Sequence, residues 1–253
     1  MNATPALVRP RFASDLDPLA ALWITRLCAS FTAACSQLNN GVYSEDTRQM
    51  IGLEPREGKL SSLELRPLLK RRANELEQLP PKKSILTRNV LLLSELLNLD
   101  DVQQSVLTFA ALSEQHPFLS DILENIRTTS IDAVAKLLSV ALRVRDTDIR
   151  RAIRPDGPLF LSRLVSIDSK NRGHDLELVM PPNLRSALFY PASSLEKLMS
   201  SFLEPAPRPK LKWEDFAHLK LETELLVSYL SNASDGLHSG INILTSQTGS
   251  GLR

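Results

Sequence analysis

Apolar residues, most of them leucine, recur at helical spacing in one segment of the chain after another, and this pattern constrains the fold more than any other feature. Aromatic residues make up only 5% of the 253 residues, which favours packing of helices over a β-sandwich. Sixteen prolines against nine glycines indicate many helix ends and stiff connectors. The sequence therefore predicts a mainly α, multi-helix protein, long enough for one large domain or two small ones.

The first predicted helix begins near Asp17, which we expect to cap it, with Pro18 at its first position. Its apolar residues include Trp23, interpreted as a core anchor. Cys28 and Cys35 lie one heptad apart in the same predicted helix, and we interpret them as buried, reduced thiols. The polar segment 39–58 is predicted to be a connector or surface loop.

A charged helix is predicted over 65–79, where Lys70, Arg71 and Arg72 are opposed by Glu75 and Glu77. We interpret this as a solvated face of mixed charge. Two further helices form a hairpin, the first capped by Ser84 and the second by Asp100 or Asp101. A third apolar segment covers them at 118–126.

The order of elements changes after Thr129. Ser130 opens a predicted helix that reaches Leu142, residues 143–145 form a turn, and a second helix runs over 146–153. Two predicted strands follow, 164–168 and 176–179, joined by a polar tip at 169–173. Helix, turn, helix and two-stranded hairpin is the order of a winged helix-turn-helix, placed here at about 130–190.

Two interpretations of this segment remain open. As a DNA-binding module, it would use Arg150, Arg151 and Arg154 on the second helix and Lys170 and Arg172 on the wing. As a protein-interaction module, its arginines would pair with neighbouring aspartates instead. The interleaved acidic residues favour the protein module, and a formal net charge of +1 does not indicate a globally basic nucleic-acid binder.

Three alternating prolines at Pro205, Pro207 and Pro209 predict a semi-rigid linker over 204–212. The predicted organisation is an N-terminal helix and connector at 1–58, a helical domain at 59–203, this linker, and a separate segment at 213–253. A helix expected over 219–230 would expose an apolar stripe.

The last segment resembles the entry to a bacterial AAA+ ATPase module. The segments 215–219, 225–230 and 240–244 follow the short acidic-aromatic stretch, helix and strand that precede Walker A in that family. The family pattern resembles Gly-x-Asn-Ile-Leu-Leu-Tyr-Gly-Pro-Pro-Gly-Thr-Gly-Lys-Thr, and this chain is similar to it through Leu244. Thr248, Gly249, Ser250 and Gly251 echo its phosphate-binding core, one residue out of register, and Leu252 stands where the lysine is expected.

The resemblance implies a truncated start of an α/β nucleotide-binding domain, with a P-loop that is cut off, frameshifted or diverged. In an intact relative it implies ATP and magnesium as cofactors, ATP hydrolysis and assembly into rings. We expect this chain to carry no cofactor and not to be an enzyme as given, because Walker B, the sensors and the arginine finger would follow Walker A.

The predicted function is recognition of a protein substrate or partner for such a motor. Two alternatives are a winged-helix DNA-binding module and a non-functional truncated gene product. The four histidines show no metal-ligand spacing, and no apolar run approaches the roughly 18 residues of a membrane span, so we expect a cytoplasmic protein without a membrane or metal partner.

Overall fold

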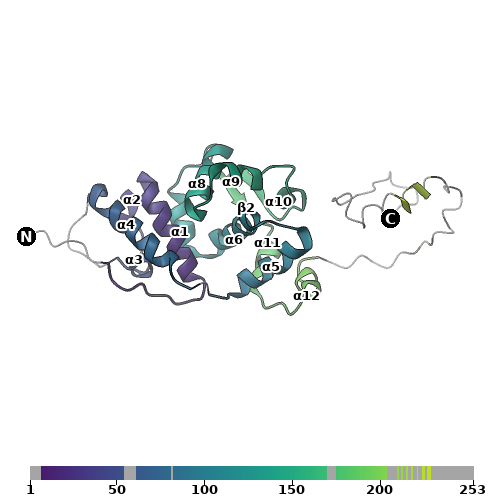
Figure 1. Ribbon diagram of the computed structural model, residues 1–253, viewed down its shortest axis with the longest axis horizontal. Helices are drawn as coiled ribbons and strands as arrows, with labels where there is room; N and C mark the ends of the chain where they lie inside the picture. The colour runs from purple at the N-terminus through teal and green to yellow at the C-terminus, as the bar shows by residue number, and fades with distance from the viewer. Residues whose placement is uncertain are drawn as a thin grey trace, which may run out of the picture. The chain divides into compact units, whose positions relative to one another are not determined.

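A computed structural model describes residues 7–53, 61–80, 82–169 and 175–203. It also describes Lys210, Lys212, Asp215, His218, Leu221, Glu224, Leu225, Val227 and Ser228. Within these residues there are twelve helices and one antiparallel two-stranded sheet, which confirms the mainly α fold with a short hairpin (Figure 1). The chain divides into two compact units, Met1–Leu203 and Glu204–Arg253.

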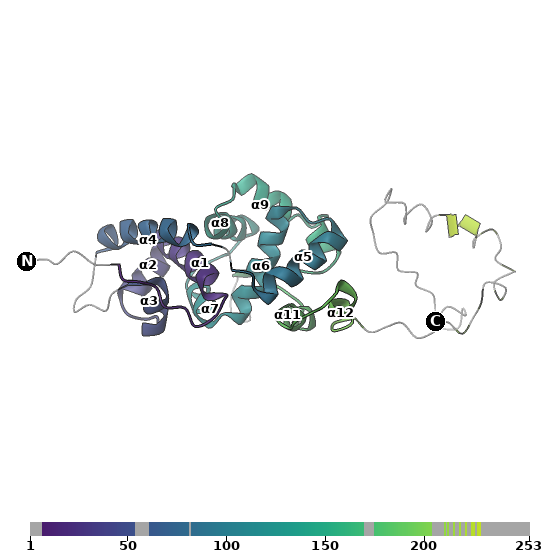
Figure 2. The same cartoon turned by 60° about the horizontal axis from the view of Figure 1, so that its bottom comes forward.

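Helix α1 is the central helix of the N-terminal part of the first unit. It packs against three helices that follow it in sequence, as both ribbon views show (Figures 1 and 2). These four helices are α1 (Asp17–Ser30), α2 (Thr32–Asn39), α3 (Glu45–Ile51) and α4 (Ser62–Glu77). Trp23 of α1 is 3% exposed, and its ring centroid lies 5.1 Å from that of Phe109, so its predicted role as a core anchor is confirmed.

The single helix expected to carry both cysteines is broken at Phe31. The Phe31 backbone is extended, with φ −96° and ψ 122°, and its N–H donates to Leu27 O, which ends α1. The axes of α1 and α2 differ by 106°. Cys28 and Cys35 therefore lie on different helices, although both thiols are buried and free as expected.

Asp17 does not cap α1 in the way the sequence predicted. The residue before the helix is Leu16, which has no side chain able to cap. The Asp17 carboxylate instead accepts hydrogen bonds from the backbone N–H of Ala13 and of Ser14, 2.5 and 3.0 Å away, and thereby fixes the turn that leads into the helix.

The segment predicted to be a polar connector contains α3. Ser44 caps it by accepting a hydrogen bond from Thr47 N, and Gly52 ends it in the left-handed conformation at φ +68°. Its buried residues Met50 and Ile51 join the core. Glu45 and Asp46 form the exposed side of this short helix, whereas polar Thr47 is buried.

Arg72 corrects the interpretation of the charged helix α4 as a fully solvated face. The Arg72 residue is only 5% exposed, and its guanidinium donates to Val8 O at 2.5 Å and to Gly52 O at 3.2 Å. It also pairs with Glu75 at 2.9 Å. Arg72 thus joins the N-terminal strand-like segment and the end of α3 to α4.

The central helices begin at the predicted caps. Ser84 and Asp100 each accept a hydrogen bond from the backbone N–H three residues on, and both form reciprocal capping boxes. The three helices are α5 (Ile85–Leu97), α6 (Asp101–Gln115) and α7 (Pro117–Glu124). Helix α6 packs against α5, α7, α8 and α9, so it is the second central element of this unit.

The segment after Thr129 follows the predicted order closely. Ser130 caps the first helix, and Arg143 ends it with a left-handed backbone at φ 56°. A short extra helix, α10, precedes the hairpin, in which Ser166 pairs with Val179 and Ser169 with Leu176. The elements are α8 (Ile131–Leu142), α9 (Asp146–Ala152), α10 (Pro158–Leu161), β1 (Ser166–Ser169) and β2 (Leu176–Val179).

The last helices of the first unit, α11 (Pro182–Phe189) and α12 (Leu195–Met199), lie beside α5 (Figures 1 and 2). Buried Asn89 of α5 donates from Nδ2 to Leu188 O at 3.0 Å and to Tyr190 O at 2.8 Å. This amide therefore satisfies carbonyl groups at the end of α11 and fixes α11 on the core.

In the second unit, Leu221, Leu225 and Val227 are helical and exposed, in agreement with the predicted apolar stripe. Lys212 N donates to the Asp215 carboxylate at 2.7 Å ahead of this helix.

Candidate functional site

Five arginines between residues 143 and 154 form the arginine cluster, the surface that the DNA-binding interpretation would use. Its members are Arg143, Arg145, Arg150, Arg151 and Arg154. Their side chains are 45% to 83% exposed, so they face solvent as a binding surface would.

Every arginine of the cluster pairs with a carboxylate. Arg150 contacts Asp146 at 2.5 Å on its own helix and also Asp132 of α8. Arg145 and Arg151 share Asp148, at 2.8 and 3.7 Å. The remaining pairs are Arg143 with Glu77 and Arg154 with Asp156.

The ion pairs shift the pKa values of two side chains, Arg150 and Asp156. Hydrogen bonds to Asp146 and Asp132 raise the pKa of Arg150 above its ordinary value. The hydrogen bond from Arg154 lowers the pKa of Asp156. The five guanidinium groups thus face five carboxylates, one of which, Glu77, is shared with Arg26 at 2.8 Å.

The other residues predicted for DNA or nucleotide binding lie outside the described residues. This holds for Lys170 and Arg172 on the wing and for Thr248, Gly249, Ser250 and Gly251 of the predicted phosphate-binding turn. Of the predicted DNA-contacting residues, the structure brings Arg150 and Arg151 together on α9, with Arg154 just beyond its end.

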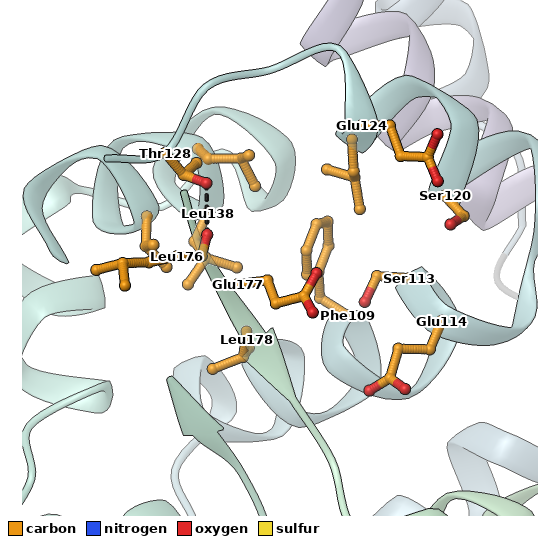
Figure 3. A pocket seen from close by; sticks show the side chains of 13 residues that line it. Phe109, Ser113, Glu114, Ser120, Glu124, Thr128, Leu138, Leu176, Glu177 and Leu178 are labelled. Atoms are coloured by element: carbon orange, nitrogen blue, oxygen red, sulfur yellow. Dashed lines mark hydrogen bonds between the residues drawn. The ribbon is translucent and has the colours of Figure 1, made fainter. Parts of the chain in front are cut away.

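A pocket on the other side of α8 was not predicted from the sequence. It lies between α6, α7, α8 and β2, has a volume of about 290 Å³ and is lined by thirteen residues (Figure 3). Phe109 and Leu138 are buried in its wall, at 3% and 0% exposure, and Leu178 contributes from the hairpin at 8%.

Thr128 joins the segment before α8 to β2 at this pocket. Its carbonyl accepts from Leu176 N at 2.6 Å, and its hydroxyl donates to Leu176 O at 2.5 Å, the contact drawn as a dashed line in Figure 3. Thr128 N in turn donates to the Asp175 carboxylate at 3.2 Å. The edge of the hairpin is therefore held against the helices, which gives the pocket a fixed wall.

Three glutamates, Glu114, Glu124 and Glu177, belong to the pocket lining. Glu114 accepts a hydrogen bond from Met180 N at 3.0 Å and pairs with Arg185 of α11. Figure 3 shows the Glu177 side chain extending from β2 into the pocket. The sequence offered no signal for this grouping, because the three residues come from three separate elements and only the tertiary fold brings them together.

Comparison of this sequence with protein-family models, curated proteins and solved structures finds no match.

The described residues contain no group of three or more His, Cys, Asp or Glu side chains placed to hold a metal ion. No single described helix has the length and apolar composition to cross a membrane, and only α1 and α2 taken together, across their bend, meet that criterion.

His116 is a buried histidine that occupies the C-cap of α6 and the N-cap of α7. It is 9% exposed at the junction of α6 and α7, where its Nε2 lies 3.4 Å from Asp17. Burial lowers its pKa, although the hydrogen bond and the charge of Asp17 act in the opposite direction. Neither His116 nor Asp17 lines the pocket, and their contact joins two helices in the core.

Proposed function

We propose that this chain is a recognition region of a bacterial AAA+ ATPase that binds a protein substrate or partner and presents it to the ATP-driven motor. The resemblance at 240–244 and the helical positions Leu221 and Leu225 ahead of it support the family. The pairing of all five arginines of the arginine cluster supports a protein partner, and this single observation carries the choice over DNA.

The helix-turn-helix order of α8 and α9, followed by the β1–β2 hairpin, supports a winged-helix-like module. A DNA-reading module places an exposed helix with several free donors in the major groove. Here α9 is only seven residues long, and its first turn holds Asp146 and Asp148. We infer that this module serves protein interaction.

The preference for a protein partner over DNA has an electrostatic reason. Affinity for DNA comes largely from cations that neutralise phosphates and release counterions. Each guanidinium of the arginine cluster would have to exchange a carboxylate for a phosphate, and the displaced carboxylate would remain beside the DNA and repel it. The gain per arginine is therefore small.

Fluorescence anisotropy with a random labelled duplex tests the choice. For the full chain at physiological salt, we expect no saturable binding tighter than about 10⁻⁵ M, which lies within the range of non-specific binders. The matched variant Asp146→Asn with Asp148→Asn removes the carboxylate partner of Arg145 and Arg151 and one of the two partners of Arg150, and we expect it to gain affinity for the duplex. Tight binding by the unmodified chain that Arg150→Ala with Arg151→Ala abolishes would establish the DNA-binding module and overturn the proposal.

The positive test is identification of the partner. The full chain, carrying a photo-crosslinking residue in place of exposed Lys136 on α8, is expressed in its source cells, and crosslinked proteins are identified by mass spectrometry. A candidate then has to bind the purified chain with a defined stoichiometry in calorimetry, and added duplex DNA should not compete. Failure of every candidate to bind in purified form would count against a protein-recognition role.

A further inference from the structure

We infer that the pocket between α6, α7, α8 and β2 holds one long cationic side chain, lysine or arginine, of a bound protein segment. This inference deepens the proposed function and rests on it, because it names the chemistry by which a partner would be recognised.

The size of the pocket points to a single side chain. Its volume of about 290 Å³ lies at or below the lower limit of small-molecule sites, which occupy roughly 300–1,000 Å³. Phe109, Leu138 and Leu178 provide an apolar wall against which a chain of methylene groups can pack.

Two hydroxyl groups of the lining, those of Ser113 and Thr128, act as acceptors toward the pocket. The Ser113 hydroxyl donates its proton to Ala110 O at 3.0 Å, and the Thr128 hydroxyl donates its proton to Leu176 O. Each hydroxyl oxygen therefore presents only lone pairs to any further partner. An occupant that carries N–H donors can therefore hydrogen-bond to both oxygens.

The carboxylates add negative charge to the same acceptor-rich surface. Glu114, Glu124 and Glu177 belong to the lining, and none of the described lining residues is Lys or Arg. Arg185 balances Glu114 from outside the lining. Glu124 has no hydrogen-bond or ion-pair partner among the described residues, and it is exposed at the pocket.

The apolar wall, the acceptor atoms and the carboxylate of Glu124, unpaired among the described residues, together match a side chain with an aliphatic stem and a cationic head. Lysine and arginine are the protein side chains with both properties, and they bury the stem while the head stays near water. An anionic side chain would be repelled by Glu124, and a purely apolar one would leave the acceptor oxygens of Ser113 and Thr128 without a donor from the occupant.

Methyl NMR on the full chain tests this inference with three blocked pentapeptides, identical except for a central lysine, norleucine or glutamate between two leucines. We expect the lysine peptide to shift the methyl signals of Leu138, Leu176 and Leu178 in a saturable way. Norleucine keeps the stem without the ammonium group, so its affinity should be at least about tenfold lower. The glutamate peptide should cause no saturable shift.

Substitution of the pocket carboxylates provides the second arm. Glu124→Gln keeps the shape of an exposed side chain, and we expect it to weaken the lysine peptide about two- to fivefold, with a larger loss when Glu177→Gln is added. Glu95→Gln on α5, exposed and outside the pocket lining, is the matched control and should change nothing. Far-UV circular dichroism checks that each variant is folded.

Two results would overturn the inference: equal affinity for the lysine and norleucine peptides, or loss of binding in Glu95→Gln as large as in Glu124→Gln. Binding of n-butylamine as tight as that of the lysine peptide would overturn the protein origin of the occupant.

If the peptides fail to bind while a purified partner protein still binds Glu124→Gln normally, the pocket inference alone is wrong. Tight binding of duplex DNA through Arg150 would instead overturn the proposed function.

Discussion

His116 Nε2 lies 3.4 Å from the Asp17 carboxylate, and this contact joins the start of α7 to the first turn of α1 inside the core. Burial raises the pKa of Asp17, but hydrogen bonds from Ser14, Ala13 and His116 together outweigh burial and lower it below its ordinary value. Burial is the main cause of the lowered pKa of His116.

Acid should destabilise the protein in two steps. The pKa of His116 is lower in the folded chain than the 6.5 of a free histidine, so the unfolded chain binds the proton more readily and stability falls as pH drops below about 6.5. The lowered pKa of Asp17 adds a second loss as pH falls below its ordinary 3.8. Urea unfolding from pH 8 to pH 4 measures the first step, and its extension below pH 3.8 measures the second. His116→Gln should remove most of the first step, whereas exposed His218→Gln should leave the slope as it is.

Removal of the Trp23 side chain should cost about 3–5 kcal/mol of the free energy of unfolding, because Trp23 is 3% exposed and packs on the Phe109 ring. Urea unfolding at neutral pH measures the loss for Trp23→Ala. Leu63→Ala is the control, since Leu63 is 86% exposed and its change should stay within about 0.5 kcal/mol. A loss for Trp23→Ala as small as that of the control would contradict its role in the core.

Gly52 and Gly41 form a matched pair that separates backbone strain from crowding. Both have positive φ, +68° and +71°, so alanine at either position should cost about 1–2 kcal/mol from the left-handed backbone. A Cβ at Gly52 would also lie 2.4 Å from Val8 O and 2.9 Å from the Arg72 guanidinium, whereas at Gly41 nothing lies within 4 Å. Gly52→Ala should therefore lose about 1–3 kcal/mol more than Gly41→Ala in thermal or urea unfolding. Equal losses would mean that Val8 and Arg72 do not close over Gly52 in solution.

The chain should not hydrolyse ATP, because Leu252 stands where a P-loop lysine would contact the β- and γ-phosphates. Phosphate release from millimolar ATP with magnesium measures turnover, and a thermal-shift assay measures binding. Turnover that disappears in Gly249→Ala or Gly251→Ala would show that the loop works without that lysine.

The caps made much of the helix prediction possible. Ser84, Asp100 and Ser130 each precede an apolar run, and each accepts the hydrogen bond that its position predicted. Strand β2 likewise occupies its predicted residues 176–179. These signals are local, because the capping residue and the N–H it accepts from are three residues apart.

Several features depend on distant contacts and escaped prediction for that reason. In the sequence, Arg72 is not distinguishable from the exposed Arg71 beside it. In the structure its guanidinium donates to Val8 O and Gly52 O, which are distant along the chain. Helix α1 ends at Ser30 although the apolar pattern runs on, because α2 turns away to pack on α4. The pocket glutamates come from α6, α7 and β2, and no spacing in the sequence links them.

The balance of the arginine cluster also sets how fast a partner can arrive there. The guanidinium groups of the cluster are paired with carboxylates at close range, so their fields largely cancel within a few ångströms of the surface. A molecule that approaches this face is therefore not steered by charge. Its association rate constant should be on the order of 10⁵–10⁶ M⁻¹ s⁻¹, as for neutral surfaces, and should change little with added salt.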